Sequence, residues 1–183
     1  MQYGPNMMNN MNYINLIGQN MRLNAITNEF QKCQQDEDLL ELGCIFQLED
    51  NNIDKWRVKM NGPKETPYEN GIFTIRVIFP PEYPNKGPEF RFINKIYHLN
   101  VDFKNIKTLG HISLNHINEW AITGKVGNIH GYGVKHALFD IFCLFFSQGV
   151  ESCYDYQMAK LYKDNRNEFN KIAKEWTYNY AKG

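Results

Sequence analysis

The stretch "GPKETPYENGIFTIRVIFPPEYPNKGPEFRF", residues 62–92, carries the clearest signals of the fold. In "FTIRVIF", residues 73–79, every second residue counted from Phe73 is apolar, which predicts a strand that buries one face. The segment "EFRFI", residues 89–93, repeats this pattern with two phenylalanines. Prolines separate the two runs, and they suit a turn-rich crossing in which a missing N–H donor does no harm. The stretch therefore predicts two sequential strands joined by turns.

The flanking sequence extends this pattern on both sides. Upstream, "CIFQL" (44–48) and "DKWRVKM" (54–60) predict two more strands, and the Lys-Arg-Lys alternation of the second predicts one solvated face. Apolar residues at three- and four-residue steps predict a helix from Met21 to about Gln34. After residue 98, an irregular region is expected up to Trp120, followed by helices from about Val134 to the end. The expected helical apolar residues are Met21, Ala25, Ile26, Phe30 and Cys33 in the first helix, Leu138, Ile141, Phe142 and Phe145 in a later one, and Phe169, Ile172, Ala173, Trp176 and Tyr180 in the last.

This order of elements predicts an α+β fold. It consists of an N-terminal helix, a four-stranded antiparallel meander, an irregular region and C-terminal helices. With 183 residues the chain is long enough for one domain with a substantial core.

Charge and cysteine content narrow the classes of function. Twenty basic and twenty acidic side chains cancel, so we expect no nucleic-acid partner, and no stretch is long and apolar enough to span a membrane. Four cysteines without a C-x-x-C pair favour a reduced intracellular protein over a disulfide framework. Because no targeting segment is evident, we expect the cytoplasm or nucleus, with an organelle such as the mitochondrion as the alternative when the chain belongs to a large complex.

Residues 1–19 differ in composition from the rest of the chain. They are rich in Asn and Met and contain no charged side chain. Alone, such a segment should not offset its ordering entropy, so we expect it to gain order on a protein partner. Its apolar residues that would contact this partner are Met7, Met8, Met11, Tyr13, Ile14 and Leu16.

Three stretches together closely resemble the ubiquitin-conjugating enzymes, which carry ubiquitin or a related modifier as a thioester and pass it to a lysine. They are residues 62–92 with "FPPEYP", "KIYHLN" (95–100), and "LYKDNRNEFNKIAKEWTYNYA" (161–181). Their order and spacing make a chance match improbable, and the likeness covers about residues 20–181. The resemblance implies the α+β fold of that family for residues 20–183, with residues 1–19 as an extension.

The resemblance also indicates a candidate site. In the family, the nucleophile lies in a segment of the form Gly-x-Ile-Cys-Leu, and this chain has Gly-His-Ile-Ser-Leu at residues 110–114, so Ser113 stands in the place of the cysteine. Asn100 is the expected oxyanion stabiliser, and His98 opens the motif that contains it. A serine hydroxyl is a far weaker acid than a thiol and needs an adjacent base. We therefore expect Ser113 to abolish conjugation in its usual form.

Further departures from the family pattern surround these residues. The family's His-Pro-Asn is His98-Leu99-Asn100 here, and an acidic residue that follows the cysteine by two positions is Asn115. The interval from His98 to Ser113 is several residues longer than in the family, which we expect to displace Asn100 relative to Ser113.

The loops that dock a ligase in the family also differ. Polar Asn85 follows "YP" where many members have a bulky apolar residue. After Trp120, "AITGKVGNIHGYG" replaces the family's Ser-Pro-Ala loop, and "SQGVESCYDY" replaces its Pro-Asn-Pro segment.

Three hypotheses follow. The first is a catalytically inactive conjugating-type domain that serves as a protein-binding or structural subunit of a larger assembly. The second is an active ubiquitin (or ubiquitin-like) conjugating enzyme in which the cysteine has been replaced by Ser113. The third is an inactive partner that binds ubiquitin or a ubiquitin-like protein and helps an active enzyme to position it.

Other chemistries find little support in the sequence. Ser113 lies between His111 and His116, but no G-x-S-x-G elbow accompanies it, which argues against a serine hydrolase. The five histidines fit no standard zinc spacing, so we expect neither a metal nor a cofactor. We expect Cys143 to be inert packing in a buried helix and Cys153 to lie nearer the surface.

Overall fold

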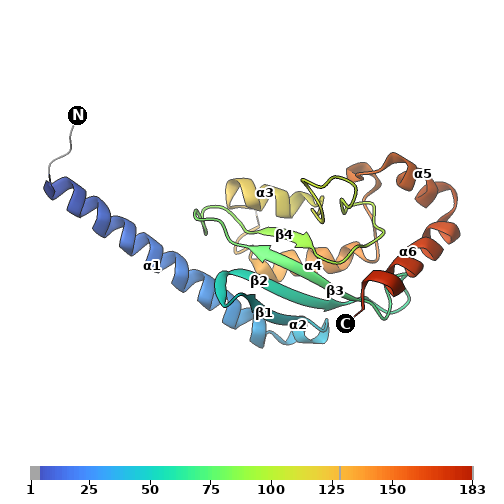
Figure 1. Cartoon of the computed structure of the whole chain (residues 1–183), viewed down its shortest axis with the longest axis horizontal. Coiled ribbons are helices and arrows are strands. Elements are labelled where there is room, and N and C mark those ends of the chain that lie inside the picture. The colour runs from blue at the N-terminus through green and yellow to red at the C-terminus, as the bar shows by residue number, and fades with distance from the viewer. Residues whose placement is uncertain (1–4, 128, 183) are drawn as a thin grey trace.

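The structure is a computed structural model that describes residues 5–127 and 129–182, with side chains from residue 15 onward. It has the expected α+β architecture (Figure 1). The elements in chain order are α1 (Pro5–Gln35), α2 (Glu37–Glu41), β1 (Ile45–Glu49), β2 (Asn52–Asn61), β3 (Ile72–Ile78), β4 (Glu89–Phe92), α3 (Asn115–Thr123), α4 (Val134–Leu144), the short 3-10 helix η1 (Val150–Ser152), α5 (Tyr156–Asp164) and α6 (Arg166–Tyr180).

The sheet is the predicted antiparallel meander. Its four strands lie in the order β1-β2-β3-β4, so each strand pairs with the next one along the chain. On β2, Trp56, Val58 and Met60 are fully buried, whereas Arg57 between them is exposed. The alternation read from the sequence therefore separates an inner, apolar face from an outer, solvated face.

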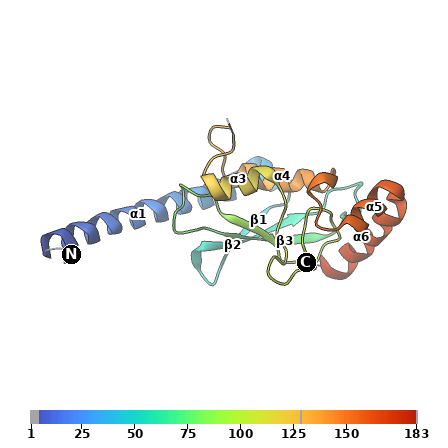
Figure 2. The ribbon, with the colours of Figure 1, turned by 90° about the horizontal axis from the view of Figure 1, so that it is seen from above.

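Helix α4 packs on the inner face of the sheet. Figure 2 shows α3 and α4 on one side of the strands, with α5 and α6 at one end. Just after α4, the ring of Phe145 lies 5.0 Å from that of Phe73 on β3 and 6.2 Å from that of Phe92 on β4, measured between centroids. The helix and the sheet thus share one core, and the segment that leaves α4 is anchored against the sheet.

Helix α1 corrects one prediction. It begins at Pro5 instead of near Met21, and Met21 is 68% exposed, although Ile26 and Cys33 are buried as expected. Proline is favoured in the first turn of a helix, and no glycine or proline interrupts the chain from there until Gly18. The predicted C-terminal end at about Gln34 is confirmed, and Asp36 caps the short helix that follows.

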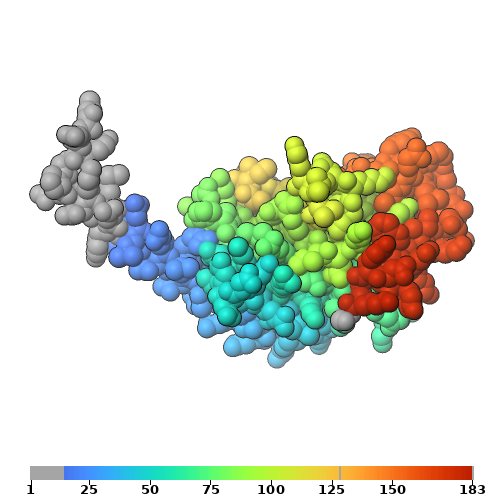
Figure 3. All heavy atoms as spheres, viewed as in Figure 1, coloured from blue at the N-terminus to red at the C-terminus, as the bar shows by residue number. Residues whose placement is uncertain are grey.

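Two further features concern α1 and the region before Trp120. Figure 3 shows α1 projecting from the body of the molecule just after residue 14, whereas its C-terminal half, with buried Ile26 and Cys33, packs against the body. The region from His98 to Trp120, expected to be irregular throughout, contains the first part of helix α3, which continues to Thr123 and ends where Gly124 adopts a left-handed conformation with φ 70°. In the part of the chain that the structure describes, no helix combines the length and apolarity needed to cross a bilayer.

Candidate functional site

Ser113 lies two residues before helix α3, at the end of a short antiparallel contact between two loop segments. Val101 and Ile112 form an isolated β-bridge, and the N–H of Ser113 donates to the carbonyl oxygen of Asn100 over 2.8 Å. The structure thus brings together two of the three residues that the resemblance indicated. Our expectation that the longer interval would displace Asn100 from Ser113 was wrong.

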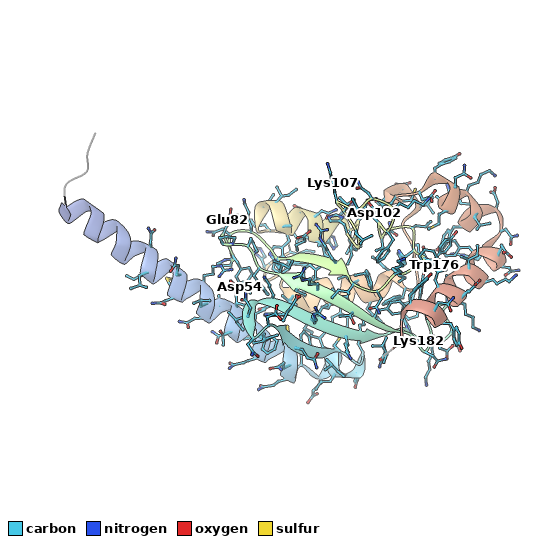
Figure 4. All side chains as sticks on the ribbon, viewed as in Figure 1. Asp54, Glu82, Asp102, Lys107, Trp176 and Lys182 are labelled. Atoms are coloured by element: carbon cyan, nitrogen blue, oxygen red, sulfur yellow. The ribbon has the colours of Figure 1, made fainter. Side chains whose placement is uncertain are left out.

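The extra residues of the interval between His98 and Ser113 form a closed loop between Asp102 and Gly110, hereafter the excursion. The Asp102 carboxylate accepts hydrogen bonds from the Thr108 hydroxyl and from the N–H groups of Lys104 and Asn105. Burial raises the pKa of this carboxyl, but these hydrogen bonds outweigh burial and hold it below its usual value. Figure 4 shows Lys107 pointing away from the body above Asp102. Because the excursion is closed at its base, it lengthens the chain without separating the segments on either side of it.

The side chain of Asn100 is occupied by structural hydrogen bonds. It is 1% exposed, its Nδ2 donates to the carbonyl oxygens of Gly149 (2.9 Å) and Ser152 (3.2 Å), and its Oδ1 accepts from the N–H of Gly149 (2.8 Å). An amide has two N–H donors, and both have partners here. Asn100 can therefore stabilise a developing oxyanion only if it breaks contacts that hold the segment after α4.

His98, the third candidate, is also a structural residue. Its Nδ1 accepts from the N–H of Asn100 over 3.0 Å, so the ring proton lies on Nε2, 3.0 Å from the carbonyl oxygen of Leu144. Burial lowers the pKa of His98 to about 4, although the hydrogen bond to Leu144 acts in the opposite direction. His98 is thus neutral near pH 7 and, at 2% exposure, is buried within the fold.

A polar network that the sequence did not reveal supports the same segment. The Gln148 side chain accepts from the N–H of Leu99 over 2.9 Å and donates to the Tyr68 hydroxyl over 2.7 Å. That hydroxyl in turn donates to the carbonyl oxygen of Tyr97 over 2.8 Å. Gln148 is 8% exposed and Tyr68 is fully buried. The one available signal was a glutamine four residues after the end of an apolar helix, which does not by itself predict a buried partner.

An open pocket of about 360 Å³ lies beside Ser113. Its polar lining includes Asn100, Ser113, His116, Asp140, Cys143 and Ser147. The Nδ1 of His116 lies 3.1 Å from the Asp140 carboxylate, and this carboxylate also accepts from the Tyr132 hydroxyl over 2.7 Å. Cys143 is exposed, so our expectation of a buried thiol was wrong: it lies outside the stripe of α4 that faces the sheet.

On the other side of Ser113 lies Tyr154. Its hydroxyl is 2.5 Å from Nδ1 of His111, and its backbone N–H donates to Leu99. Burial raises the pKa of the Tyr154 phenol and the Asp102 carboxylate acts in the same direction, whereas Arg91 and Ser113 offset this only in part. The titratable group beside Ser113 on this side is therefore a neutral phenol, which is a poor base for deprotonating an alcohol.

Metal binding has no candidate site in the described residues. Within residues 5–127 and 129–182, the structure contains no group of three or more His, Cys, Asp or Glu side chains placed to hold a metal ion.

Comparisons with known proteins agree on one family. A family model described as ubiquitin-conjugating enzyme matches residues 25–177. The chain is 32% identical over 139 residues to a protein from Dictyostelium discoideum named ubiquitin conjugating enzyme E2 B, and the match covers 76% of this chain and 86% of that protein.

Two solved structures show the same fold. A ubiquitin-conjugating enzyme domain from Toxoplasma gondii is 29% identical with a TM-score of 0.71, covering 86% of this chain and 98% of that chain. A structure from Plasmodium yoelii, titled as a ubiquitin-conjugating enzyme, is 28% identical with a TM-score of 0.74, covering 88% of this chain and 96% of that chain.

Proposed function

This chain belongs to the ubiquitin-conjugating enzyme family, and from that membership we propose that it is a catalytically inactive member that serves as a protein-binding or structural subunit of a larger assembly. The proposal takes Ser113 as the counterpart of the family's cysteine. The observation that carries it is the hydrogen bonding of Asn100, whose amide is committed to the fold beside a residue that has no thiol.

The chemistry of residue 113 is the first argument. A thioester carrier needs a thiolate to attack the incoming acyl group and a good leaving group to release it. The Ser113 hydroxyl supplies neither, and the neighbouring Tyr154 is a phenol whose pKa is raised. An ester formed at Ser113 would also hold its cargo too firmly for transfer to a lysine.

The surroundings of residue 113 are the second argument. Asn100 would have to release the carbonyl oxygens of Gly149 and Ser152 before either N–H could reach an oxyanion. The proline loop presents exposed Asn85 where many members offer a ligase an apolar side chain. A family member that cannot be loaded with a modifier, and whose ligase-binding loop is polar, keeps the fold for its contacts with other proteins.

The N-terminal helix supports a binding role. α1 begins at Pro5, and on its exposed part Leu16, Ile17 and Met21 are 55%, 42% and 68% exposed. The part of α1 up to residue 19 has no charged side chain. A helical segment without charges or an amphipathic stripe has little to stabilise it in water. We propose that residues 1–19 contact another subunit, in a reducing compartment such as the cytoplasm, the nucleus or, in a large complex, an organelle. Ubiquitin or a ubiquitin-like protein is a further candidate partner.

Thioester formation tests the proposal. The variant Ser113→Cys is incubated with activating enzyme, ATP and ubiquitin, and reductant-sensitive adducts are resolved on gels beside the Dictyostelium relative as positive control. We expect no adduct with the original protein and no more than a trace with the variant, because Asn100 and the loops are unchanged. Robust loading of Ser113→Cys would overturn the proposal.

The alternative is an active conjugating enzyme in which the cysteine has been replaced by Ser113. One observation favours it: Ser113 is only partly buried and lines an open pocket of about 360 Å³, so an acyl donor could approach it. The same experiment separates the two, since the alternative requires rapid loading of Ser113→Cys and discharge to free lysine.

A further inference from the structure

A second pocket, of about 470 Å³, lies between the segment that precedes the excursion and the two C-terminal helices. It is lined by residues from the segment 96–104, from the segment 154–161 and from α6. Nine of its fourteen lining residues are apolar or aromatic, and four of these carry rings, namely Tyr97, Phe103, Tyr154 and Trp176. Its volume lies within the range of roughly 300–1,000 Å³ that is typical of small-molecule sites. We refer to it as the aromatic pocket.

The charged side chains of the lining are already paired within the fold. The Asp155 carboxylate accepts from Lys104 and from two N–H groups in the first turn of α5, and the hydrogen bond from Lys104 is the main reason why the pKa of Asp155 lies below its usual value. Lys104 itself is 73% exposed and shares its charge with Asp155, so it offers an anion little net attraction. Asp102 holds the base of the excursion. A charged ligand would therefore lose its hydration in this pocket without gaining a free counter-charge.

The backbone groups along one wall are also in use. The carbonyl oxygens of Tyr97 and Leu99, and the N–H groups of Leu99, Val101 and Asp102, all have hydrogen-bond partners inside the fold. An extended peptide that binds a protein gains much of its affinity from main-chain hydrogen bonds to an exposed strand edge. This wall has no such edge to offer, which favours a ligand that binds through its rings.

Two neutral donors in the lining remain free for such a ligand. The hydroxyl of Tyr97 and the indole N–H of Trp176 have no hydrogen-bond partner within residues 5–127 and 129–182, and both side chains are half-buried. Burial raises the pKa of the Tyr97 phenol, so this hydroxyl keeps its proton at neutral pH. The centroids of the two rings lie 5.6 Å apart, with 58° between their planes. Rings at such an angle offer both edges and faces to a third ring.

The apolar lining is incompletely covered by the chain itself. Phe103, Met158 and Leu161 are only half-buried. A ring placed among them removes apolar surface from water, and a methionine sulfur makes favourable contacts with aromatic rings. The pocket thus offers a ligand apolar burial and neutral hydrogen bonds, and it offers no unpaired charge.

We propose that the aromatic pocket binds a neutral aromatic small molecule. Its ring system packs among the aromatic side chains of the lining, and a hydroxyl or carbonyl group on it accepts from Tyr97 or Trp176. This site goes beyond the proposed function, because it requires neither chemistry at Ser113 nor a partner subunit. It adjoins the candidate site through Tyr154, whose N–H donates to Leu99 and whose hydroxyl contacts His111.

The test follows the indole N–H resonances of the isotope-labelled full chain by NMR while 2-naphthol is added at pH 7. Three matched probes are titrated in parallel: anionic 2-naphthoate, cationic 2-naphthylmethylammonium, and the peptide acetyl-Gly-Trp-Gly-amide. The chain has three tryptophans, and the resonance of Trp176 is identified by its loss in Trp176→Phe. We expect a saturable shift of this resonance with 2-naphthol, with a dissociation constant about tenfold lower than that of any other probe.

Pocket variants locate the binding. Phe103→Ala removes one ring from the lining and should weaken the binding of 2-naphthol about tenfold. The matched control is Tyr178→Ala, which removes a ring that is 73% exposed on α6 outside the pocket and should have no effect. Met158→Gln keeps the length of the side chain but adds a polar amide; it should also weaken binding, and it serves as the readout if Phe103→Ala does not fold.

Each other result overturns the proposal. These results are the absence of a saturable shift at Trp176, equal or tighter binding of a charged probe or of the peptide, unchanged affinity in the folded pocket variants, and equal weakening by Tyr178→Ala. Ser113→Cys should bind 2-naphthol like the original chain whether or not it forms a thioester. Failure here is therefore distinguishable from failure of the proposed function.

Discussion

Asn100 and Ser113 are joined by a backbone hydrogen bond, whereas the Asn100 side chain makes its hydrogen bonds to other residues. The carbonyl oxygen of Asn100 accepts from the N–H of Ser113 over 2.8 Å, while the Asn100 amide is held by Gly149 and Ser152 on the other side. Asn100 thus connects three parts of the fold: its own strand-like segment before the excursion, Ser113, and the segment after α4. In this chain its side chain works as a structural clamp.

Removing the clamp should cost stability. Asn100→Ala leaves the Gly149 N–H and two carbonyl oxygens without their partner in a part of the fold where Asn100 is 1% exposed. A buried group left unsatisfied costs roughly 1–3 kcal/mol. Because Gly149 is exposed and Ser152 half-buried, water can replace part of the lost contacts, and we expect a loss of about 2 kcal/mol in the free energy of unfolding. Urea denaturation measures it, with exposed Asn115→Ala as a control that should stay within ~0.5 kcal/mol. A loss under ~1 kcal/mol for Asn100→Ala would contradict the clamp.

Closure of the excursion depends on Gly110. Its φ is +77°, and a Cβ there would lie 2.0 Å from the carbonyl oxygen of Phe92 on β4. Gly110→Ala therefore combines left-handed strain with a clash against backbone, and we expect a loss of ~3 kcal/mol or more in stability. Gly131, with φ +73° and open space around its Cβ position, is the matched control, because Gly131→Ala should cost only about 1 kcal/mol. Similar melting temperatures for the two variants would show that contact with Phe92 is unimportant.

The fold was readable from the sequence because periodic patterns report burial directly. Trp56, Val58 and Met60 alternate with basic residues, and the structure buries the first set and exposes or half-buries the second. The start of α1 was missed because composition argued for disorder, whereas Pro5 is compatible with the first turn of a helix.

The candidate site was less readable, because its geometry depends on contacts between distant segments. The motif named Asn100 and Ser113 as candidates, but the longer interval between them predicted a displacement that the structure does not show. No pattern in the sequence shows that Gly149 and Ser152 occupy the Asn100 amide. In the same way, Cys143 lies within an apolar run, yet a helix of that composition still has one side away from the sheet, and Cys143 lies there.

The four thiols should differ widely in reactivity. Burial raises the pKa of Cys33 and of Cys44 to about 12, and both side chains are 2% exposed. Since the thiolate is the reactive form, these two should not label in the folded protein at pH 8. Exposed Cys143 should label first and half-buried Cys153 more slowly. Peptide-resolved mass spectrometry after timed treatment with iodoacetamide measures the four rates. Labelling of Cys33 or Cys44 as fast as Cys143 would contradict this structure, and all four should label in denaturant.

Acid should destabilise the protein through His98. Its folded pKa, about 4, lies below the ordinary value of 6.5, because burial disfavours the charged ring. The unfolded chain therefore binds a proton more readily, and the stability that depends on neutral His98 is full above pH 6.5 and falls as the pH drops toward 4. The depression corresponds to a loss of about 3 kcal/mol across that window. Urea midpoints at intervals from pH 7.5 to 4 measure it. His98→Gln cannot titrate, so although less stable near pH 7 it should lose about 3 kcal/mol less than the original chain on acidification. Parallel pH profiles for the two proteins would refute this role of His98.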